Sequence, residues 1–181
     1  MKFCFVRHAE STNNQIAGTK PWHRQWIRMF RKDPPLTTAG WQMSKKKKIP
    51  NHNKVDIVFC SPLLRSIETA RAMFPRKRLI IAPFLRETQL GAGNFPDRKH
   101  RPKPVMSNVD TRHEQPGSRF KKHMNHSSLH DFVYLFYLPT YGHNKRHKYI
   151  AVVTHSHLMQ RDLDLQKRPP NLGHVCVDIL A

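Results

Sequence analysis

Residues 3–14 read Phe-Cys-Phe-Val-Arg-His-Ala-Glu-Ser-Thr-Asn-Asn, and the other segments of the chain are interpreted from this one. The apolar run from Phe3 to Val6 predicts a buried strand that ends directly at Arg7 and His8. The polar residues after it are typical of turns and helix starts. In open α/β sheets, ligand sites gather beyond the carboxyl ends of the strands, where rigid backbone holds reactive side chains. Taken alone, the pair of Arg7 and His8 favours a solvated arginine and a surface histidine over a functional site.

Three further apolar runs also lead into a side chain that can bind phosphate or transfer protons. Each run predicts another strand of the same sheet. The runs and the residues that follow them are 55–60 with Arg65, 79–82 with Glu87, and 152–154 with His155. Strands alternating with helical patterns predict an α/β fold, a three-layer sandwich with a mostly parallel central sheet flanked by helices.

These blocks, in this order, resemble the histidine phosphatase superfamily, also called the phosphoglycerate mutase-like family. The family signature is an Arg-His-Gly motif at the end of the first strand. The residues that carry the resemblance are Arg7-His8-Ala9, Asn14, the Pro-Leu-Thr segment at 33–40, Ser-Pro-Leu-Leu-Arg-Ser-Ile-Glu-Thr-Ala at 61–70, Leu-Arg-Glu at 85–87 and Val-Thr-His at 153–155. The resemblance spans residues 3–157 and implies the phosphoglycerate mutase-like fold.

The resemblance implies a role for each matching residue. His8 is the expected nucleophile and Glu87 the expected general acid and base. Phosphate binding is expected of Arg7, Asn14, Arg65 and His155. Catalysis is expected through a phosphohistidine, in a metal-independent phosphomonoester hydrolase of the histidine acid phosphatase-like type (EC 3.1.3) that uses no cofactor.

The residue types suit this chemistry. The oxygens of a phosphomonoester repel an incoming nucleophile, and cationic side chains relieve that repulsion. Arginine does so with paired contacts that lysine cannot make. Neutral imidazole is a good nucleophile, and a covalent intermediate divides one difficult step into two. As a general acid, Glu87 has to be held apart from the two arginines or partly desolvated, because a carboxyl group beside them tends to ionise. Glu10 is the other candidate for this role, and a structural role is expected for it.

The chain departs from the family pattern at three places. Ala9 replaces the usual glycine, Ser156-His157 replaces a Gly-Gly pair, and the segment 91–95 lacks a second acidic residue. If residue 9 needed a positive φ, the added methyl group would cost on the order of 1 kcal/mol. A second hypothesis follows, a non-catalytic polyanion-binding or nucleic-acid-binding protein on a degenerate phosphatase fold. A phosphoglycerate-type mutase is a further alternative, but the chain looks too short for the insertions that mutases carry.

Length and composition indicate the number of domains and the kinds of partner that the chain can bind. The 181 residues predict a single domain over 1–181, with a basic loop or lid at about 91–117. With 32 Lys and Arg against 12 Asp and Glu, the formal net charge is +20. Such a surface favours an anionic phosphorylated substrate and salt-sensitive, non-specific binding of nucleic acid or other polyanions. The sequence does not rank sugar bisphosphates, inositol phosphates, nucleotides and phosphoproteins as substrates, and it does not indicate the oligomeric state.

Three cysteines, Cys4, Cys60 and Cys176, lie in separate apolar runs. Their odd number and scattered positions predict buried reduced thiols rather than a disulfide framework or a zinc site. No apolar run approaches the roughly 20 residues of a membrane span, and no signal-peptide pattern is present. We therefore expect a cytoplasmic, intracellular protein. His123, His126 and His130 fall near helical spacing, but no carboxylate or cysteine accompanies them at ligand spacing, so a solvated face is expected and no metal site.

Overall fold

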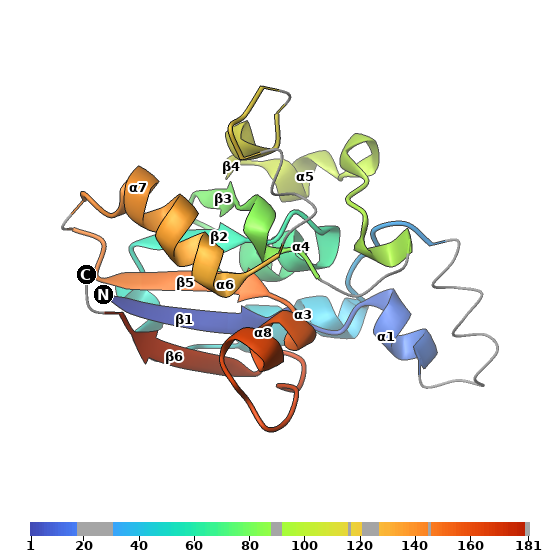
Figure 1. Ribbon diagram of the computed structural model, residues 1–181. Coiled ribbons are helices and arrows are strands. Elements are labelled where there is room, and N and C mark those ends of the chain that lie inside the picture. Colours follow the sequence, from blue (N-terminus) through green and yellow to red (C-terminus); the bar gives the residue numbers. More distant parts are fainter. Residues whose placement is uncertain (18–30, 88–91, 116, 121–126, 145, 180–181) are drawn as a thin grey trace.

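A computed structural model describes residues 1–181 except 18–30, 88–91, 116, 121–126, 145 and 180–181. Its centre is a six-stranded sheet with the strand order β4-β3-β2-β5-β1-β6 (Figure 1). The strands are β1 (Lys2–Arg7), β2 (Ile57–Cys60), β3 (Leu79–Ile81), β4 (Val109–Asp110), β5 (Tyr149–Thr154) and β6 (His174–Asp178). All neighbouring pairs are parallel except β1 and β6, which are antiparallel.

The helical elements flank this sheet. The α-helices are α1 (Thr12–Ala17), α3 (Thr38–Lys46), α4 (Leu64–Met73), α5 (Lys103–Met106), α6 (Leu129–Asp131), α7 (Leu138–Tyr141) and α8 (Ser156–Asp162). A π-helical stretch, η7 (Phe132–Tyr137), joins α6 to α7. Short 3₁₀ turns are η1 (His52–Lys54), η2 (Pro83–Leu85), η3 (Ala92–Asn94), η4 (Arg98–His100) and η5 (Arg112–Glu114).

Alternation along the strands divides the core into two halves, one on each face of the sheet. Phe3 and Phe5 point to the face covered by η7 and α8, where they pack with Phe132 and other buried aromatic residues. Cys4 and Val6 point to the opposite face, which α4 covers. Because side chains of a strand alternate between faces, both halves follow from one apolar run. Figure 1 shows the strands between the two groups of helices, so the fold is the expected three-layer α/β sandwich.

Several element ends follow the local signals in the sequence. Thr37 caps α3, where its hydroxyl oxygen accepts a hydrogen bond from the Gly40 amide, and Lys45 and Lys46 occupy the last turn. Helix α4 starts at Leu64, two residues after Pro62, and β3 stops at Ile81, earlier than the apolar run does. Proline at 83 instead begins the 3₁₀ turn η2.

The basic segment after Phe95 is more ordered than its composition predicts. It contains η4, α5, β4 and η5 where an irregular loop is expected, and β4 adds a strand at the sheet edge beside β3. A two-residue strand has no readable alternation, which is why the sequence pattern misses it.

The expectation of three reduced cysteines is wrong for two of them. Cys4 and Cys176 form a disulfide, with their Cα atoms 4.0 Å apart, and Cys60 is the buried free cysteine. The antiparallel register of β1 and β6 places Cys4 directly opposite Cys176. The two residues are 172 positions apart in the chain, so only the strand pairing reveals the bond.

The expectation for the three histidines falls partly outside the described residues, because His123 and His126 lie there. Within the described part of the chain, no group of three or more His, Cys, Asp or Glu side chains is arranged to hold a metal ion. In the same residues, no helix combines the length and apolar character that crossing a membrane requires.

Candidate active site

Two histidines meet at the carboxyl ends of the central strands. Arg7 pairs with Thr154 in the β1–β5 register, so His8 and His155 leave adjacent strand ends. The His8 amide donates to the Thr154 carbonyl at 2.9 Å, and the two imidazole centroids lie 5.1 Å apart. Their exposed fractions are 5% and 0%, so both rings are buried in the free protein.

The hydrogen bonds of His8 define its tautomer. Nδ1 lies 2.7 Å from the Ala9 carbonyl oxygen, which only accepts, so Nδ1 carries the hydrogen. Nε2 is then unprotonated and accepts a 3.2 Å hydrogen bond from Arg65 Nε. Burial, together with the nearby Arg65 charge, holds the pKa of His8 well below 6.5. At neutral pH the ring is therefore neutral, as a nucleophilic imidazole must be.

Arg65 lies beside His8 in the first turn of α4. Besides the contact with His8, its Nη1 donates to the Gly93 carbonyl and its Nη2 to Asn94 Oδ1, each at 2.8 Å. Burial lowers the pKa of Arg65 to about 10, while Glu87 and Asp33 oppose that shift. The guanidinium remains charged at neutral pH and is fixed on three sides.

Arg7 and His155 each retain a buried nitrogen without a hydrogen-bond partner. Arg7 Nη1 donates to the Pro169 carbonyl at 2.7 Å, but Arg7 Nε is unpartnered. His155 Nε2 lies 2.8 Å from Ser61 Oγ, and His155 Nδ1 is unpartnered. In the tautomer in which Ser61 Oγ donates to His155 Nε2, the Nδ1 atom carries the ring hydrogen. Arg7 Nε is a donor, and in that tautomer His155 Nδ1 is a donor as well.

Unpaired buried donors are costly unless a ligand satisfies them. Arg7 Nε and His155 Nδ1 belong to the residues that flank His8 on either side, one preceding it in β1 and one in ring contact with it. Burial, and then the charges of Arg65, His8 and Arg7, hold the pKa of His155 well below 6.5. The site thus offers two arginine cations and one neutral imidazole donor to an anion.

Glu87 is the acidic side chain of this site. It follows η2 and is buried. Its carboxylate acts on both arginines: burial lowers the pKa of Arg7 and of Arg65, and Glu87 raises them. The strand ends and the turn after β3 therefore bring Arg7, His8, Arg65, Glu87 and His155 into one cluster.

Asn14 and Glu10 make other contacts. Asn14 Oδ1 accepts from the Ser11 amide at 3.0 Å and from Ser11 Oγ at 2.9 Å, which fixes the start of α1. Its role in phosphate binding stays a prediction. Glu10 accepts from Thr37 Oγ1 at 2.8 Å, which ties the first loop to the cap of α3.

The departures from the family pattern introduce no backbone strain. Among the described residues other than glycine, a positive φ occurs at Asp33, Asn51, Asn108, Asp164 and Leu172. Ala9 and Ser156 are not among them, so neither position requires the conformational freedom of glycine. The Ala9 amide donates to Thr69 Oγ1 at 3.0 Å. Ser156 begins α8 as an ordinary helical residue.

Sequence patterns alone gave no role to four residues that support the site. Ser61 and Thr69 belong to the matched segment 61–70, and their hydroxyls hold His155 and the amide after His8. Asn94 stands where the second acidic residue is missing. Asp33 accepts from the Leu64 amide at 2.6 Å and from the Asp97 amide at 2.9 Å, so it joins the start of α4 to the basic segment.

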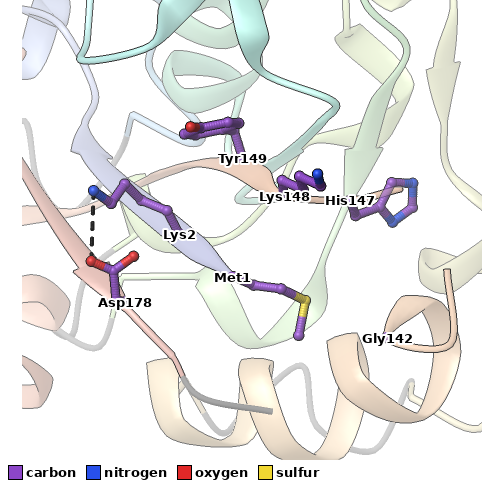
Figure 2. A pocket seen from close by; sticks show the side chains of 7 residues that line it. All are labelled: Met1, Lys2, Gly142, His147, Lys148, Tyr149 and Asp178. Atoms are coloured by element: carbon purple, nitrogen blue, oxygen red, sulfur yellow. Dashed lines mark ion pairs between the residues drawn. The ribbon is translucent and has the colours of Figure 1, made fainter. Parts of the chain in front are cut away.

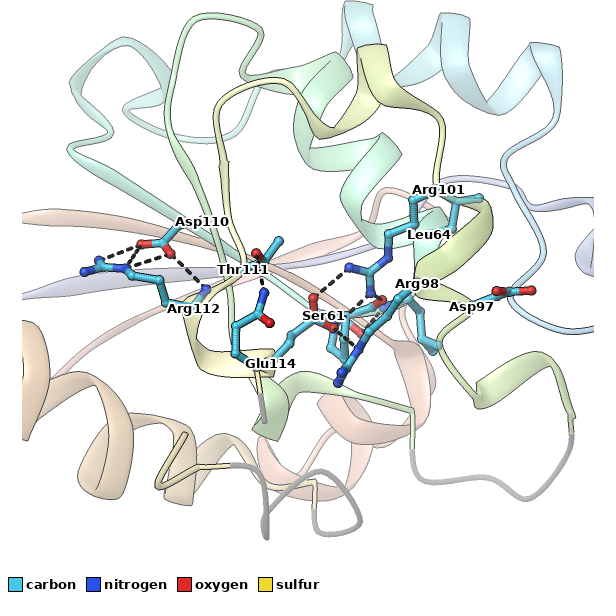
Figure 3. A network of polar contacts seen from close by, with 12 residues as sticks. Ser61, Leu64, Asp97, Arg98, Arg101, Asp110, Thr111, Arg112 and Glu114 are labelled. Atoms are coloured by element: carbon cyan, nitrogen blue, oxygen red, sulfur yellow. Dashed lines mark hydrogen bonds and ion pairs between the residues drawn. The ribbon is translucent and has the colours of Figure 1, made fainter. Parts of the chain in front are cut away.

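A buried ion pair fastens the same segment. Arg101 makes two contacts with Glu114, at 2.7 and 2.9 Å, and donates to the Pro62 carbonyl at 2.6 Å. Figure 3 shows Arg101 and Arg98 converging on Glu114 beside Ser61 and Leu64. The segment is thereby anchored at the beginning of the helix that carries Arg65.

A pocket of about 560 Å³ lies at the opposite end of the sheet. Figure 2 shows its lining by the amino ends of β1 and β5, with an ion pair between Lys2 and Asp178. Because β1 and β5 run parallel, this end is a full strand away from His8, and the pocket is separate from the histidine cluster.

Several solved structures with a similar fold are phosphatases. Phosphoserine phosphatase from Entamoeba histolytica aligns with a TM-score of 0.57 at 16% identity, over 97% of this chain and 89% of that one. The α-ribazole phosphatase from Shigella flexneri gives 0.55 at 20% identity, over 99% and 91%. Ecdysone phosphate phosphatase from Bombix mori, solved with tungstate, gives 0.61 at 14% identity, over 97% and 88%. At these low identities, the structural similarity shows that this chain shares their fold.

No curated protein sequence matches the chain. The sequence profile of the histidine phosphatase superfamily (branch 1), however, matches residues 3–164. The match includes both strand-end histidines, both arginines and Glu87. The chain belongs to the histidine phosphatase superfamily.

Proposed function

We propose that the protein is a phosphomonoester hydrolase that acts through a phosphohistidine on His8. The observation that carries the proposal is the pair of buried unpartnered nitrogens, Arg7 Nε and His155 Nδ1. They belong to two residues next to His8, one preceding it in the chain and one in ring contact with its neutral imidazole. A phosphoryl group beside His8 Nε2 would satisfy both donors. Arg65 supplies the second cation, and the similarity of fold to phosphatases supports the same reaction class.

In the first half-reaction, the His8 Nε2 lone pair forms a bond to phosphorus as the bond from phosphorus to the leaving oxygen breaks. Glu87 donates its proton to that oxygen. Arg7, Arg65 and His155 donate hydrogen bonds to the phosphoryl oxygens, which carry the charge of the transition state. The Nδ1 hydrogen bond to the Ala9 carbonyl supports the positive charge that the ring acquires.

In the second half-reaction, water attacks phosphorus and the phosphorus–nitrogen bond breaks. Glu87 takes the proton from the water, and the electron pair returns to His8 Nε2. Inorganic phosphate leaves and the starting state is restored. No residue of this scheme acts as a metal ligand, in line with the metal-independent reaction that the family resemblance implies.

The test is turnover of 4-nitrophenyl phosphate in EDTA by the wild type, His8→Ala and His157→Ala. The wild type and His157→Ala should be active, and His8→Ala should lose activity by about 10³-fold or more. Equal activity of His8→Ala and the wild type would refute the nucleophile. Loss of all activity in EDTA would refute metal independence.

The non-catalytic alternative retains one supporting observation, the formal charge of +20. It requires a folded wild type with no turnover of any phosphomonoester, together with salt-sensitive binding to single-stranded DNA. Against this alternative, neither Ala9 nor Ser156 has the positive φ that would strain a residue other than glycine.

A further inference from the structure

Arg86 and Phe95 form a cation–π pair at the border of the candidate active site. The Arg86 Cζ atom lies 5.4 Å from the centroid of the Phe95 ring. Arg86 directly precedes Glu87, and Phe95 directly follows Asn94, which accepts a hydrogen bond from Arg65. Each member of the pair is therefore one residue away from a side chain of the site.

Arg86 lacks the partners that other arginines near the site have. Its Nε is buried without a hydrogen-bond partner, and within the described residues no carboxylate pairs with it. Arg65 and Arg101, by contrast, donate to protein oxygens through their guanidinium nitrogens. Burial lowers the pKa of Arg86, and no neighbouring acid opposes that shift. A partly buried cation in this condition gains from an anionic ligand.

The geometry of the pair leaves the hydrogen-bonding edge of the arginine for a ligand. The Arg86 guanidinium lies over the Phe95 ring, and 53% of the Phe95 residue remains exposed. A cation–π contact engages the face of an aromatic ring and uses none of the guanidinium N–H groups as hydrogen-bond donors. The edge of that plane matches a carboxylate or a phosphate through two parallel hydrogen bonds.

We propose that Arg86, held by Phe95, forms a second anion subsite that receives a carboxylate or phosphate on the leaving group of the substrate. The inference rests on the proposed function and narrows the substrate class to phosphomonoesters with a second anionic group. Glu87, which protonates the leaving oxygen in the scheme above, is the chain neighbour of Arg86. In this proposal, the leaving group extends from Glu87 toward Arg86.

The test compares kcat/KM for phenyl phosphate, 4-carboxyphenyl phosphate and 1,4-phenylene bisphosphate, measured as phosphate release. Arg86→Gln should lower kcat/KM about tenfold or more on the two substrates with a second anion. Its kcat/KM on phenyl phosphate should stay within about twofold of the wild type. Arg86→Lys should fall between these values, because it keeps the charge but not the paired contacts.

Arg76→Gln is the matched control, since it removes the same charge from an exposed position just after α4. It should leave all three substrates unchanged. A loss by Arg86→Gln that is equal on all three substrates, or no loss on any, would overturn the subsite while phenyl phosphate turnover by the wild type upholds the phosphatase. A loss on only one of the anionic substrates would identify carboxylate or phosphate as the preferred group. No turnover by the wild type would overturn the phosphatase proposal, and the subsite with it.

Discussion

At the scale of single residues, the sequence identifies the reactive side chains but not their hydrogen bonds. Arg7, His8 and His155 are predictable because they end apolar runs, and parallel strands bring such ends together. The tautomer of His8 depends on the Ala9 carbonyl, and the orientation of Arg65 depends on Gly93 and Asn94. Those partners come from backbone geometry and from a segment 28 and 29 residues further along the chain, which local patterns do not record.

The buried histidines make stability depend on pH. The folded pKa of His155 lies below the unfolded value of about 6.5, so the unfolded state binds more protons as the pH falls below 6.5. This histidine therefore lowers the free energy of unfolding on acidification, by on the order of 1 to 2 kcal/mol between pH 7 and pH 5. Glu68 has the opposite effect, because burial raises its pKa to about 7.

Variants separate the contribution of His155 to this pH dependence from the contributions of other titratable groups. Between pH 7 and pH 5, the free energy of unfolding should fall less in His155→Gln than in the wild type, as measured by urea denaturation. His143→Gln, at an exposed position, should keep the slope of the wild type. Parallel slopes in all three proteins would show that His155 does not carry the pH dependence.

At the scale of elements, the long strands and the helices α3 and α4 follow the apolar patterns of the sequence, but the basic segment does not. Residues 98–114 contain short helices and β4, held by the buried pair of Arg101 and Glu114 rather than by apolar periodicity. Charged residues in such a segment are expected at the surface, and only tertiary contacts distinguish a buried pair from exposed ones. The helix cap at Thr37, which depends on near neighbours, is readable from the sequence.

Glu114→Gln should destabilise the fold strongly. The side chains of Arg101 and Glu114 are 4% and 2% exposed, so removing the carboxylate leaves a buried unpaired cation. We expect a loss of about 3 kcal/mol or more in the free energy of unfolding. Arg112→Gln removes an arginine whose side chain is 70% exposed and leaves Asp110 its ion pair with Arg78, so it should cost no more than about 1 kcal/mol. Similar losses in the two variants would contradict the buried anchor.

Gly40 permits close packing of α3 against the loop after His8. A Cβ atom at this position would overlap the backbone carbonyl of Glu10. Gly40→Ala should therefore destabilise the protein by about 1 to 3 kcal/mol, although alanine is the better helix former. Gln42→Ala, at an exposed position of the same helix, should be neutral or slightly stabilising in the same urea titration. A stabilised Gly40→Ala would show that the two backbones are not in contact.

At the scale of the whole molecule, the disulfide is the feature that the sequence conceals. Cys4 lies in the first strand and Cys176 in the last, and the bond joins the two strands that bring the ends of the chain together. An odd number of cysteines argues against a disulfide framework, but it does not exclude a single bond. The charge of +20, by contrast, is fully visible in the composition.

The disulfide predicts one titratable thiol, that of Cys60, when the protein is unfolded in denaturant without a reductant. Reduction should lower the free energy of unfolding by about 2 to 4 kcal/mol, because the reduced chain has more freedom when unfolded. The double variant Cys4→Ser/Cys176→Ser should be insensitive to reductant. Three titratable thiols in the untreated wild type would show that the bond does not form.

The central claim is that His8 becomes phosphorylated. The most direct measurement is intact-protein mass spectrometry after a rapid quench of the wild type with 4-nitrophenyl phosphate at alkaline pH, where phosphohistidine survives. Slowing the hydrolytic half-reaction with Glu87→Gln should increase the trapped fraction. The account predicts an added phosphoryl mass that peptide mapping assigns to His8 and that is missing from His8→Ala. Turnover with no phosphorylated protein in either the wild type or Glu87→Gln, or a phosphoryl group on another residue, would contradict it.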